Sequence, residues 1–293
     1  MSLKDHALIV SISVGKPQMT KTDSKATQDA EQANNAHNAG KYTKDLFPKH
    51  LIAPIKALET SARYYVERAT YPWRRGEYLL PTARFMDFAD RMAKFELEFN
   101  QLVTSFMQNF VNVLDEARAQ QGDLFDENDY PDVTDIRNRF TFSVNYLPVP
   151  EYGDFRVDLQ EEEKQLLKEQ VEAQYNEAME DMMRKPLERL REVVAKLNEV
   201  CKKDDRVSIN KRTGEPEVKP PIFRDSVVDN IKREIELLYD FAEVMPSDIQ
   251  QLNSDVAHAL REPELLRNDE GARKDVAQNT DALLEQINNM LEM

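Results

Sequence analysis

The chain has 293 residues, of which 41% are hydrophobic and 32% charged, and its formal net charge is −15. This length allows one large domain or two ordinary ones, and the acidic balance argues against general binding of nucleic acids or anionic membranes, which require a basic surface. The mean hydropathy of −0.66 indicates long helices that bury a narrow apolar stripe and expose the rest of their circumference to water.

Residue types common in catalytic and metal sites are scarce or scattered in the sequence. Glycine occurs seven times and cysteine once, at Cys201, so neither a glycine-rich phosphate loop nor an internal disulfide is expected. The four histidines have no metal-ligand spacing; they are His6, His37, His50 and His258. We expect no metal, no other cofactor and no enzymatic activity. The single cysteine and the lack of an apolar run of about 18 residues fit a cytoplasmic protein that does not enter a membrane.

Two segments have the alternating apolar pattern of β-strands. Residues 7–14 place Leu8, Val10 and Ile12 on one face, and β-branched residues favour strands. Residues 139–147 repeat the pattern with Phe140 and Phe142. We expect the two segments to pair in a small sheet at one end of a helical body, with a third short strand near residues 154–157.

Residues 16–44 are polar and contain almost no large apolar side chain. Their composition predicts a flexible linker, although residues 26–39 would form a polar helix if another element packed against them. Residues 45–70 then predict a helix, because Ile55, Leu58, Ala62 and Val66 recur at helical spacing. Residues 71–81 read as an aromatic connection to the next helix.

A stripe of phenylalanines organises residues 81–121. Apolar side chains recur there every three or four residues, which places them on one face of a long helix. They are Phe85, Phe88, Met92, Phe95, Phe99, Leu102, Phe106, Phe110, Val113 and Ala117. Such a stripe requires partner helices, and any part left uncovered would form a seam in a homo-oligomer.

Residues 158–201 predict a second long helix, which Pro186 should kink or divide. Its apolar stripe includes Tyr175, Met182, Leu190 and Leu197. The methionines at 179, 182 and 183 are most simply core filler at a helix contact. The two long helices are expected to lie antiparallel as a helical hairpin or coiled coil.

The C-terminal part of the chain is strongly acidic. Residues 202–221 predict a linker with a small hairpin near Thr213 and Gly214, and helices are expected at residues 222–244, 247–260 and 272–291. Residues 225–293 contain 16 acidic and 6 basic side chains, a net charge of −10. We therefore expect a mainly α protein with three regions: a core domain over residues 1–201 comprising the helical hairpin and a two- or three-stranded sheet, a linker over 202–221, and an acidic helical bundle over 222–293.

The best candidate recognition residues lie in the aromatic connection. They are Tyr71, Trp73, Arg74, Arg75 and Tyr78. An aromatic side chain beside paired arginines at the tip of a helical hairpin suits a contact with a protein partner or a small phosphate group. In the alternative interpretation, Trp73 and Tyr78 plug the end of the hairpin while the arginines bridge to nearby carboxylates.

A second candidate is the acidic stretch between the helices and the second strand. Its carboxylates could bind a divalent cation, but they lack the calcium-loop pattern, and a solvated acidic turn is the simpler interpretation. These residues are Asp123, Asp126, Glu127, Asp129 and Asp132.

Three segments together resemble a known family. They are ALIVSISVGKP at residues 7–17, ARYYVERATYPWRRGEYLLPTARFMDFADRM at 62–92 and RNRFTFSVNYLPVP at 137–150. With the long charged helix that follows, the chain resembles, over roughly residues 7–200, an uncharacterised domain family of bacteriophages and bacteria. Its members are often encoded beside MoxR-type AAA+ ATPases and von Willebrand A domain proteins similar to cobalt chelatase subunits. The resemblance implies an accessory protein of an ATPase-driven remodelling module, encoded by a phage and located in the host cytoplasm, and it assigns no catalytic residue.

These observations favour a non-enzymatic helical interaction or adaptor protein that binds a protein partner such as a AAA+ ATPase. The acidic C-terminal part leaves open a host-directed inhibitor that mimics DNA or blocks a defence system. The acidic turns leave open, as the weakest alternative, a metal-dependent hydrolase.

Overall fold

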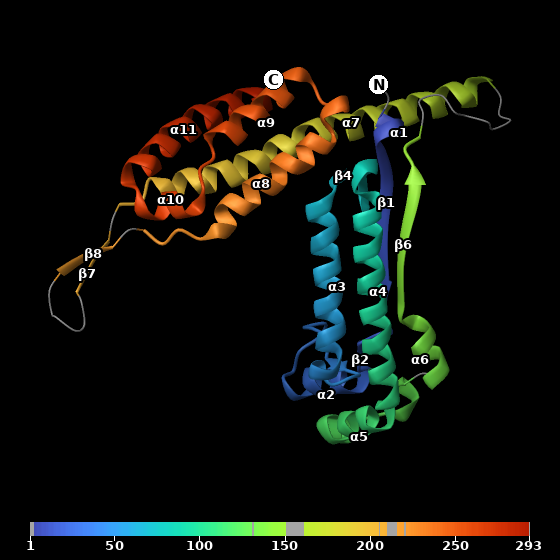
Figure 1. Ribbon diagram of the computed structural model, residues 1–293. Helices are drawn as coiled ribbons and strands as arrows, with labels where there is room; N and C mark the ends of the chain where they lie inside the picture. Colours follow the sequence, from blue (N-terminus) through green and yellow to red (C-terminus); the bar gives the residue numbers. More distant parts are fainter. Residues whose placement is uncertain are drawn as a thin grey trace. The chain divides into compact units, whose positions relative to one another are not determined.

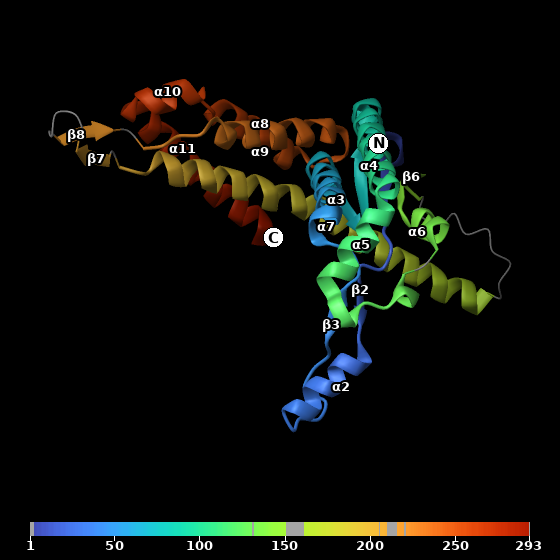
Figure 2. The same cartoon turned by 90° about the horizontal axis from the view of Figure 1, so that it is seen from below.

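The computed structural model in Figures 1 and 2 describes residues 3–130, 132–150, 161–204, 206–209, 216–219 and 221–292. Contacts divide the chain into two compact units. Unit one comprises Met1–Ile9, Ala69–Phe85 and Leu147–Met293, and unit two comprises Val10–Arg68 and Met86–Tyr146. These boundaries cut across the domain boundaries expected at residues 201 and 222.

The largest sheet has four strands in the order β4-β5-β1-β6. Strands β1 (Ala7–Gly15) and β6 (Thr141–Pro148) are neighbours, which confirms the pairing expected from their alternating patterns. Strands β4 (Tyr71–Arg74) and β5 (Glu77–Pro81) form an antiparallel hairpin where the sequence suggested an irregular connection. The third strand expected near residues 154–157 lies outside the described residues.

Unit two buries the phenylalanine stripe against its own helices and strands. Helix α3 (Lys49–Ala69) packs beside α4 (Phe85–Gln108) (Figure 1), and the ring of Tyr65 stacks on Phe88 with centroids 5.6 Å apart. Phe99 contacts Phe142 of β6 at a centroid distance of 5.6 Å. All the stripe residues are described, and only Phe85 and Leu102 are half-buried while the others are buried. The stripe is therefore covered within the chain.

The expected continuity of the helix that carries this stripe needs correction. The helix is not continuous: α4 ends at Gln108, Asn109 has φ −99° and ψ 12°, and α5 (Phe110–Gln121) follows. The Asn109 amide donates to the Ser105 carbonyl at 2.8 Å, a side-chain bond that competes with helical geometry.

Strand β6 lies along α4 rather than at the end of a helical body, because Tyr146 contacts Phe88 and Phe142 contacts Phe99. The antiparallel pairing of the two long helices is not confirmed, because α4 packs within unit two and α7 within unit one.

The polar residues 16–45 form a small βαβ insertion in place of the expected linker. Strands β2 (Thr20–Thr22) and β3 (Thr43–Asp45) pair antiparallel, and α2 (Ser24–Ala33) connects them. Helix α2 buries no residue, so its order depends on the base of the insertion. There Lys44 Nζ lies 2.6 Å from the Asp129 carboxylate and 3.4 Å from that of Asp23, and Lys21 also pairs with Asp129.

Short elements complete unit two after α5. They are the 3-10 turns η2 (Gly122–Leu124) and η3 (Glu127–Asp129) and the helix α6 (Val133–Arg139). The phenol of Tyr130, which follows η3, donates to the Leu46 carbonyl at 2.7 Å. This bond helps to hold the acidic stretch against the start of α3.

Unit one is a helical bundle built on the second long helix. Helix α7 runs from Glu161 to Cys201, so Pro186 does not divide it. Two apolar residues in the first half of this helix, Leu167 and Val171, have side chains outside the described set. The remaining helices are α1 (Leu3–His6), α8 (Asp225–Asp240), α9 (Ser247–Ala259), α10 (Pro263–Asn268) and α11 (Glu270–Glu292), with 3-10 turns η1 (Thr82–Arg84) and η4 (Ala242–Val244). Helices α8, α9 and α11 confirm the three C-terminal helices expected from the sequence, and they pack alongside α7 (Figures 1 and 2).

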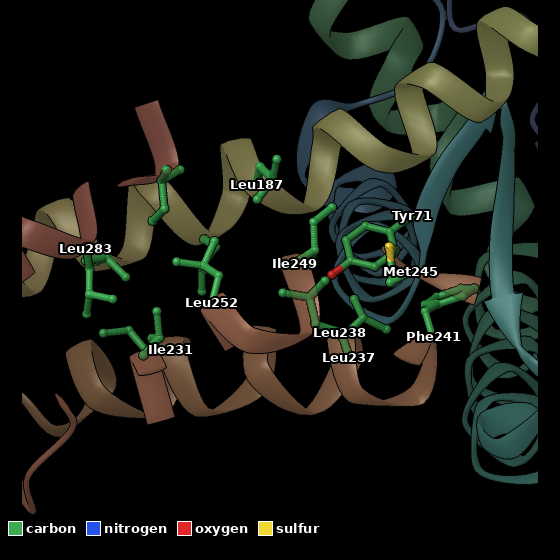
Figure 3. Close-up of a cluster of buried hydrophobic side chains, with 14 of the residues drawn as sticks. Tyr71, Leu187, Ile231, Leu237, Leu238, Phe241, Met245, Ile249, Leu252 and Leu283 are labelled. Atoms are coloured by element: carbon green, nitrogen blue, oxygen red, sulfur yellow. The ribbon is translucent and has the colours of Figure 1, made fainter. Parts of the chain in front are cut away.

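The bundle has an apolar centre with a few buried polar groups. Figure 3 shows Leu238, Ile249 and Leu252 between α7 and α8. Asn198 of α7 donates to the carbonyl of Ala277 and to the hydroxyl of Thr280 on α11, both at 2.9 Å. Because a buried amide without partners would be costly, these bonds fix α7 against α11 and explain why the long helix packs with the C-terminal helices.

A hairpin follows α7, as expected. Strands β7 (Arg206–Ile209) and β8 (Pro216–Lys219) pair antiparallel, with Arg206 opposite Lys219. Thr213 and Gly214 lie between them, outside the described residues.

Truncation of Phe99 tests the role of the phenylalanine stripe. Its side chain is fully buried, so Phe99→Ala should lower the free energy of unfolding by about 3 to 5 kcal/mol through lost burial and a cavity. Met86→Ala on the same helix, at a position that is 68% exposed, should change it by less than about 0.5 kcal/mol. Urea unfolding followed by circular dichroism measures both, and equal effects would contradict the packing described.

The Asp129 carboxylate should make unit two sensitive to acid. Burial acts to raise the pKa of Asp129, but hydrogen bonds from Lys21 and Lys44 outweigh burial and lower this pKa below its usual value. The stabilisation that the Asp129 ion pairs give to unit two is therefore complete above the pKa of aspartate in the unfolded chain, about 4. It is lost as the pH falls through the lower pKa of Asp129 in the folded chain. Asp129→Asn should lower the free energy of unfolding by about 1 to 3 kcal/mol at pH 7, because it removes the nearer of the two carboxylates that pair with the buried Lys44. The same substitution should weaken the loss of stability between pH 4 and pH 2.

The matched control is Asp115→Asn, which removes an exposed carboxylate paired with Arg118 and should cost less than about 1 kcal/mol. Urea unfolding at pH 7 and at pH 3 compares the variants. If Asp129→Asn behaved like Asp115→Asn at both pH values, the buried pair would not anchor the insertion.

Candidate functional site

The β4–β5 hairpin carries all the candidate recognition residues. Tyr71 lies opposite Leu79 and Arg74 opposite Glu77, with a shift of register between Pro72 and Arg74. The shift leaves Trp73 as an extra residue on β4, which is the arrangement of a β-bulge. Gly76 has φ +81° in the turn, a conformation that glycine adopts without the steric cost of a Cβ atom.

Tyr71 and Trp73 belong to the core of unit one rather than to its surface. Tyr71 is fully buried, its ring lies 5.4 Å from that of Phe241, and the guanidinium of Arg189 lies 5.1 Å above it. Burial, with a smaller contribution from the negative charge of Glu234, raises the pKa of Tyr71 well above its usual value, so the phenol stays neutral. The two aromatic residues expected to contact a partner therefore support the hairpin from inside.

Trp73 fastens the hairpin directly to α7. Its indole is 2% exposed and meets the ring of Tyr175 edge to face at 5.9 Å. Farther along α7, Arg189 donates to the Thr70 carbonyl at 2.9 Å. This placement agrees with the alternative interpretation for Trp73, in which the indole is a plug, while Tyr78 is only half-buried.

The hairpin and α7 enclose an open groove of about 590 Å³. Arg74, Arg75 and Tyr78 line it from the hairpin, and Glu177 and Asp181 line it from α7. Both arginines are exposed. The groove thus offers guanidinium groups on one side and carboxylates on the other.

The hairpin arginines are available to a ligand. Neither guanidinium forms an ion pair within the described part of the chain, so the expected bridges from Arg74 and Arg75 to nearby carboxylates are not seen there. The indole Nε1 of Trp73, which also lines the groove, has no acceptor among the described residues. The two exposed guanidinium groups are therefore free to bind a ligand, whereas the indole nitrogen is buried behind them.

Tertiary structure adds residues that the sequence did not single out. Glu177 and Asp181 are one helical turn apart on α7, a spacing common on any solvated helix face. Their sequence separation from the hairpin is about 100 residues, and no local pattern connects them to it. The i, i+4 pair of carboxylates was the only available signal.

The acidic stretch between α5 and β6 has structural roles. Asp126 accepts a hydrogen bond from the Asn128 amide at 2.9 Å, and Asp132 accepts one from Thr134 at 2.8 Å, as helix caps do. Asp129 pairs with the lysines of the insertion. Over the residues whose placement is described, no group of three or more His, Cys, Asp or Glu side chains is arranged to hold a metal ion.

Two further features are the single cysteine and the carboxylates of the C-terminal part. Cys201 is buried, and burial raises its pKa to about 11, which keeps the thiol protonated and unreactive near neutral pH. The carboxylates of the C-terminal part are spread over α8, α9, α10 and α11. Several pair with cations, as Glu262 does with Lys232 at 3.2 Å and Glu270 with Lys274 at 2.6 Å.

Substitution of Gly76 tests the geometry of the hairpin turn. Gly76→Ala should destabilise unit one by about 1 to 2 kcal/mol, because an alanine at φ +81° is strained although nothing lies within 4 Å of its Cβ. Gly40→Ala is the control, since that position has open space and no positive φ. Thermal unfolding compares the two variants, and a neutral Gly76→Ala would argue against this turn.

No helix in the described segments combines the length and apolarity needed to cross a membrane.

Comparison with known proteins gives a family but no described relative. No curated protein and no solved structure matches the chain. Residues 6–204 match a family described as "Protein of unknown function (DUF3150)", which covers more than half of the 293 residues and includes the β4–β5 hairpin. The chain therefore belongs to the DUF3150 family.

Proposed function

We propose that this chain is a non-enzymatic adaptor protein that binds a protein partner through the groove between the β4–β5 hairpin and α7. The observation that carries the proposal is the contrast within one hairpin. Tyr71 and Trp73 are buried and fixed to the bundle, whereas Arg74 and Arg75 are exposed and have no carboxylate partner in the described chain.

A rigid support favours binding because less conformational freedom is lost when the complex forms. The arginines at the hairpin tip suit carboxylates or carbonyl groups of a partner, since a guanidinium binds such groups bidentately. Glu177 and Asp181 on the opposite side of the groove suit a basic residue of the same partner. The groove therefore selects a protein segment of mixed charge over a uniformly charged polymer.

The partner that we propose is a MoxR-type AAA+ ATPase acting with a von Willebrand A module. This assignment rests on the sequence resemblance over residues 7–200, whose family members are often encoded beside such proteins. In this proposal the chain is phage-encoded and presents substrates to the ATPase or positions it. Homo-oligomerisation through the phenylalanine stripe is not part of the proposal, because the stripe is covered within unit two.

Charge reversal at the hairpin tip tests the proposal. The tagged chain is co-expressed with a MoxR-type ATPase from the same genome, and the ATPase retained on the tag is measured. Arg74→Glu combined with Arg75→Glu should reduce retention at least tenfold, because the groove would then carry negative charge on both sides.

The matched control is Arg191→Glu combined with Arg233→Glu, which changes the charge of unit one equally at two other exposed arginines. Circular dichroism checks that both double variants are folded. Retention unaffected by the hairpin variant, or no retention of the ATPase by the unsubstituted chain, would refute the proposal.

A further inference from the structure

A second groove of unit one, here called the methionine groove, lies between α7, α9 and α11. Its volume is about 680 Å³. Its apolar lining consists of Met179, Met183 and Leu187 of α7, Ile249 of α9, and Met290 and Leu291 of α11. Leu187 and Ile249 are buried at its base, whereas the three methionines are half-buried.

The methionines of α7 differ in their burial. Met182 is fully buried in the bundle, as expected of core filler, but Met179 and Met183 face the groove. Methionine is unbranched and polarizable, so exposed clusters of it adapt to apolar side chains of a partner. Met179, Met183 and Met290 pack against the core of the bundle on one side and line the groove on the other, so part of each side chain stays open to a ligand.

The spacing of the apolar lining along α7 suits an opposing helix. Met179, Met183 and Leu187 follow one another at i, i+4 and i+8 along α7, a distance of about 12 Å at 1.5 Å per residue. This length matches two turns of an opposing helix, whose apolar side chains recur at i, i+4 and i+7. Helical walls on three sides also leave no strand edge for β-pairing within the groove.

The charged side chains that line the groove favour a positively charged partner. Glu180 and Asp248 line the groove and are exposed. Arg184 also lines it, but its guanidinium is bound to Glu188 at 2.7 Å. Among the described residues, the lining charge without an ion-pair partner is therefore negative. Residues 225–293, which supply α9 and α11, carry a net charge of −10.

We propose that the methionine groove binds an amphipathic helix of a partner protein, with the apolar face of that helix on the methionines and flanking lysine or arginine residues beside Glu180 and Asp248. The groove shares no lining residue with the hairpin groove, so this inference does not rest on the proposed adaptor function. It gives the chain a second recognition surface with a defined ligand chemistry.

A designed peptide tests the proposal on the full chain. The probe is a fluorescently labelled helix of roughly 18 residues with leucines at i, i+4 and i+7 and lysines elsewhere, and fluorescence anisotropy measures its Kd. A second peptide keeps the leucines and replaces each lysine by glutamate. The lysine peptide should bind at least tenfold more tightly than the glutamate peptide, and the difference should shrink at high salt.

Substitutions locate the binding site. Met183→Glu and, separately, Met290→Glu should each weaken the lysine peptide at least tenfold, and Met86→Glu at an exposed position of unit two should leave it unchanged. Glu180→Lys combined with Asp248→Lys should reverse the preference toward the glutamate peptide. Circular dichroism confirms folding, and two separate methionine variants keep the test informative if one fails to fold.

Four results would overturn the proposal. They are no binding of the lysine peptide, equal binding of both peptides, binding that neither methionine variant weakens, and binding that Met86→Glu weakens equally. Sedimentation that shows a dimer which Met183→Glu dissociates would also overturn it, because the occupant would then be a second copy of this chain.

Discussion

The burial of Tyr71 and Trp73 against the α7 bundle is the interaction on which the candidate site depends. A short hairpin with two exposed arginines would be mobile alone, since isolated hairpins are marginally stable in water. Here one face of β4 lies in the core of unit one, and Arg189 ties Thr70 to α7. The same contacts that stabilise the hairpin place its arginines opposite Glu177 and Asp181.

Helix α7 connects this site to the rest of unit one. Its buried face packs on the C-terminal helices, with Asn198 bonded to α11, while its other faces border the hairpin groove and the methionine groove. A single rigid helix thus presents two surfaces of different chemistry, one with arginines and carboxylates and one with methionines. Such a division suits a protein that holds two partners or two parts of one partner.

Periodicity predicted the individual elements well. Each element buries one face, and its apolar side chains recur with the period of that element. This holds for the alternation in residues 7–14 and 139–147 and for the helical spacing around Phe99. Which elements pack together was harder to predict, because an apolar stripe indicates that a helix face is buried but does not indicate which element buries it. The stripe of α4 is covered by α3 and β6 rather than by α7. At Asn109, where α4 gives way to α5, the side-chain amide bonds to the Ser105 carbonyl, and the apolar spacing on either side continues without a sign of the break.

The candidate residues were found from their types, but their roles were not. Tyr71, Trp73, Arg74 and Arg75 stand together in the sequence. Only the packing of β4 on the core of unit one shows that the two aromatic residues are buried while the arginines are exposed. The carboxylates at 177 and 181 had no distinguishing pattern. The insertion at residues 16–45 has the composition of a linker because it buries few apolar side chains. Its contacts are strand pairing and ion pairs to Asp23 and the distant Asp129, which no local pattern reveals.

Hydrogen exchange of the full chain, with and without the MoxR-type ATPase, tests the central claim most directly. The account predicts that the partner slows exchange of backbone amides in residues 71–81 and 177–181, the two sides of the hairpin groove. Protection confined to unit two, or no change in exchange at the hairpin in a complex that forms, would contradict it.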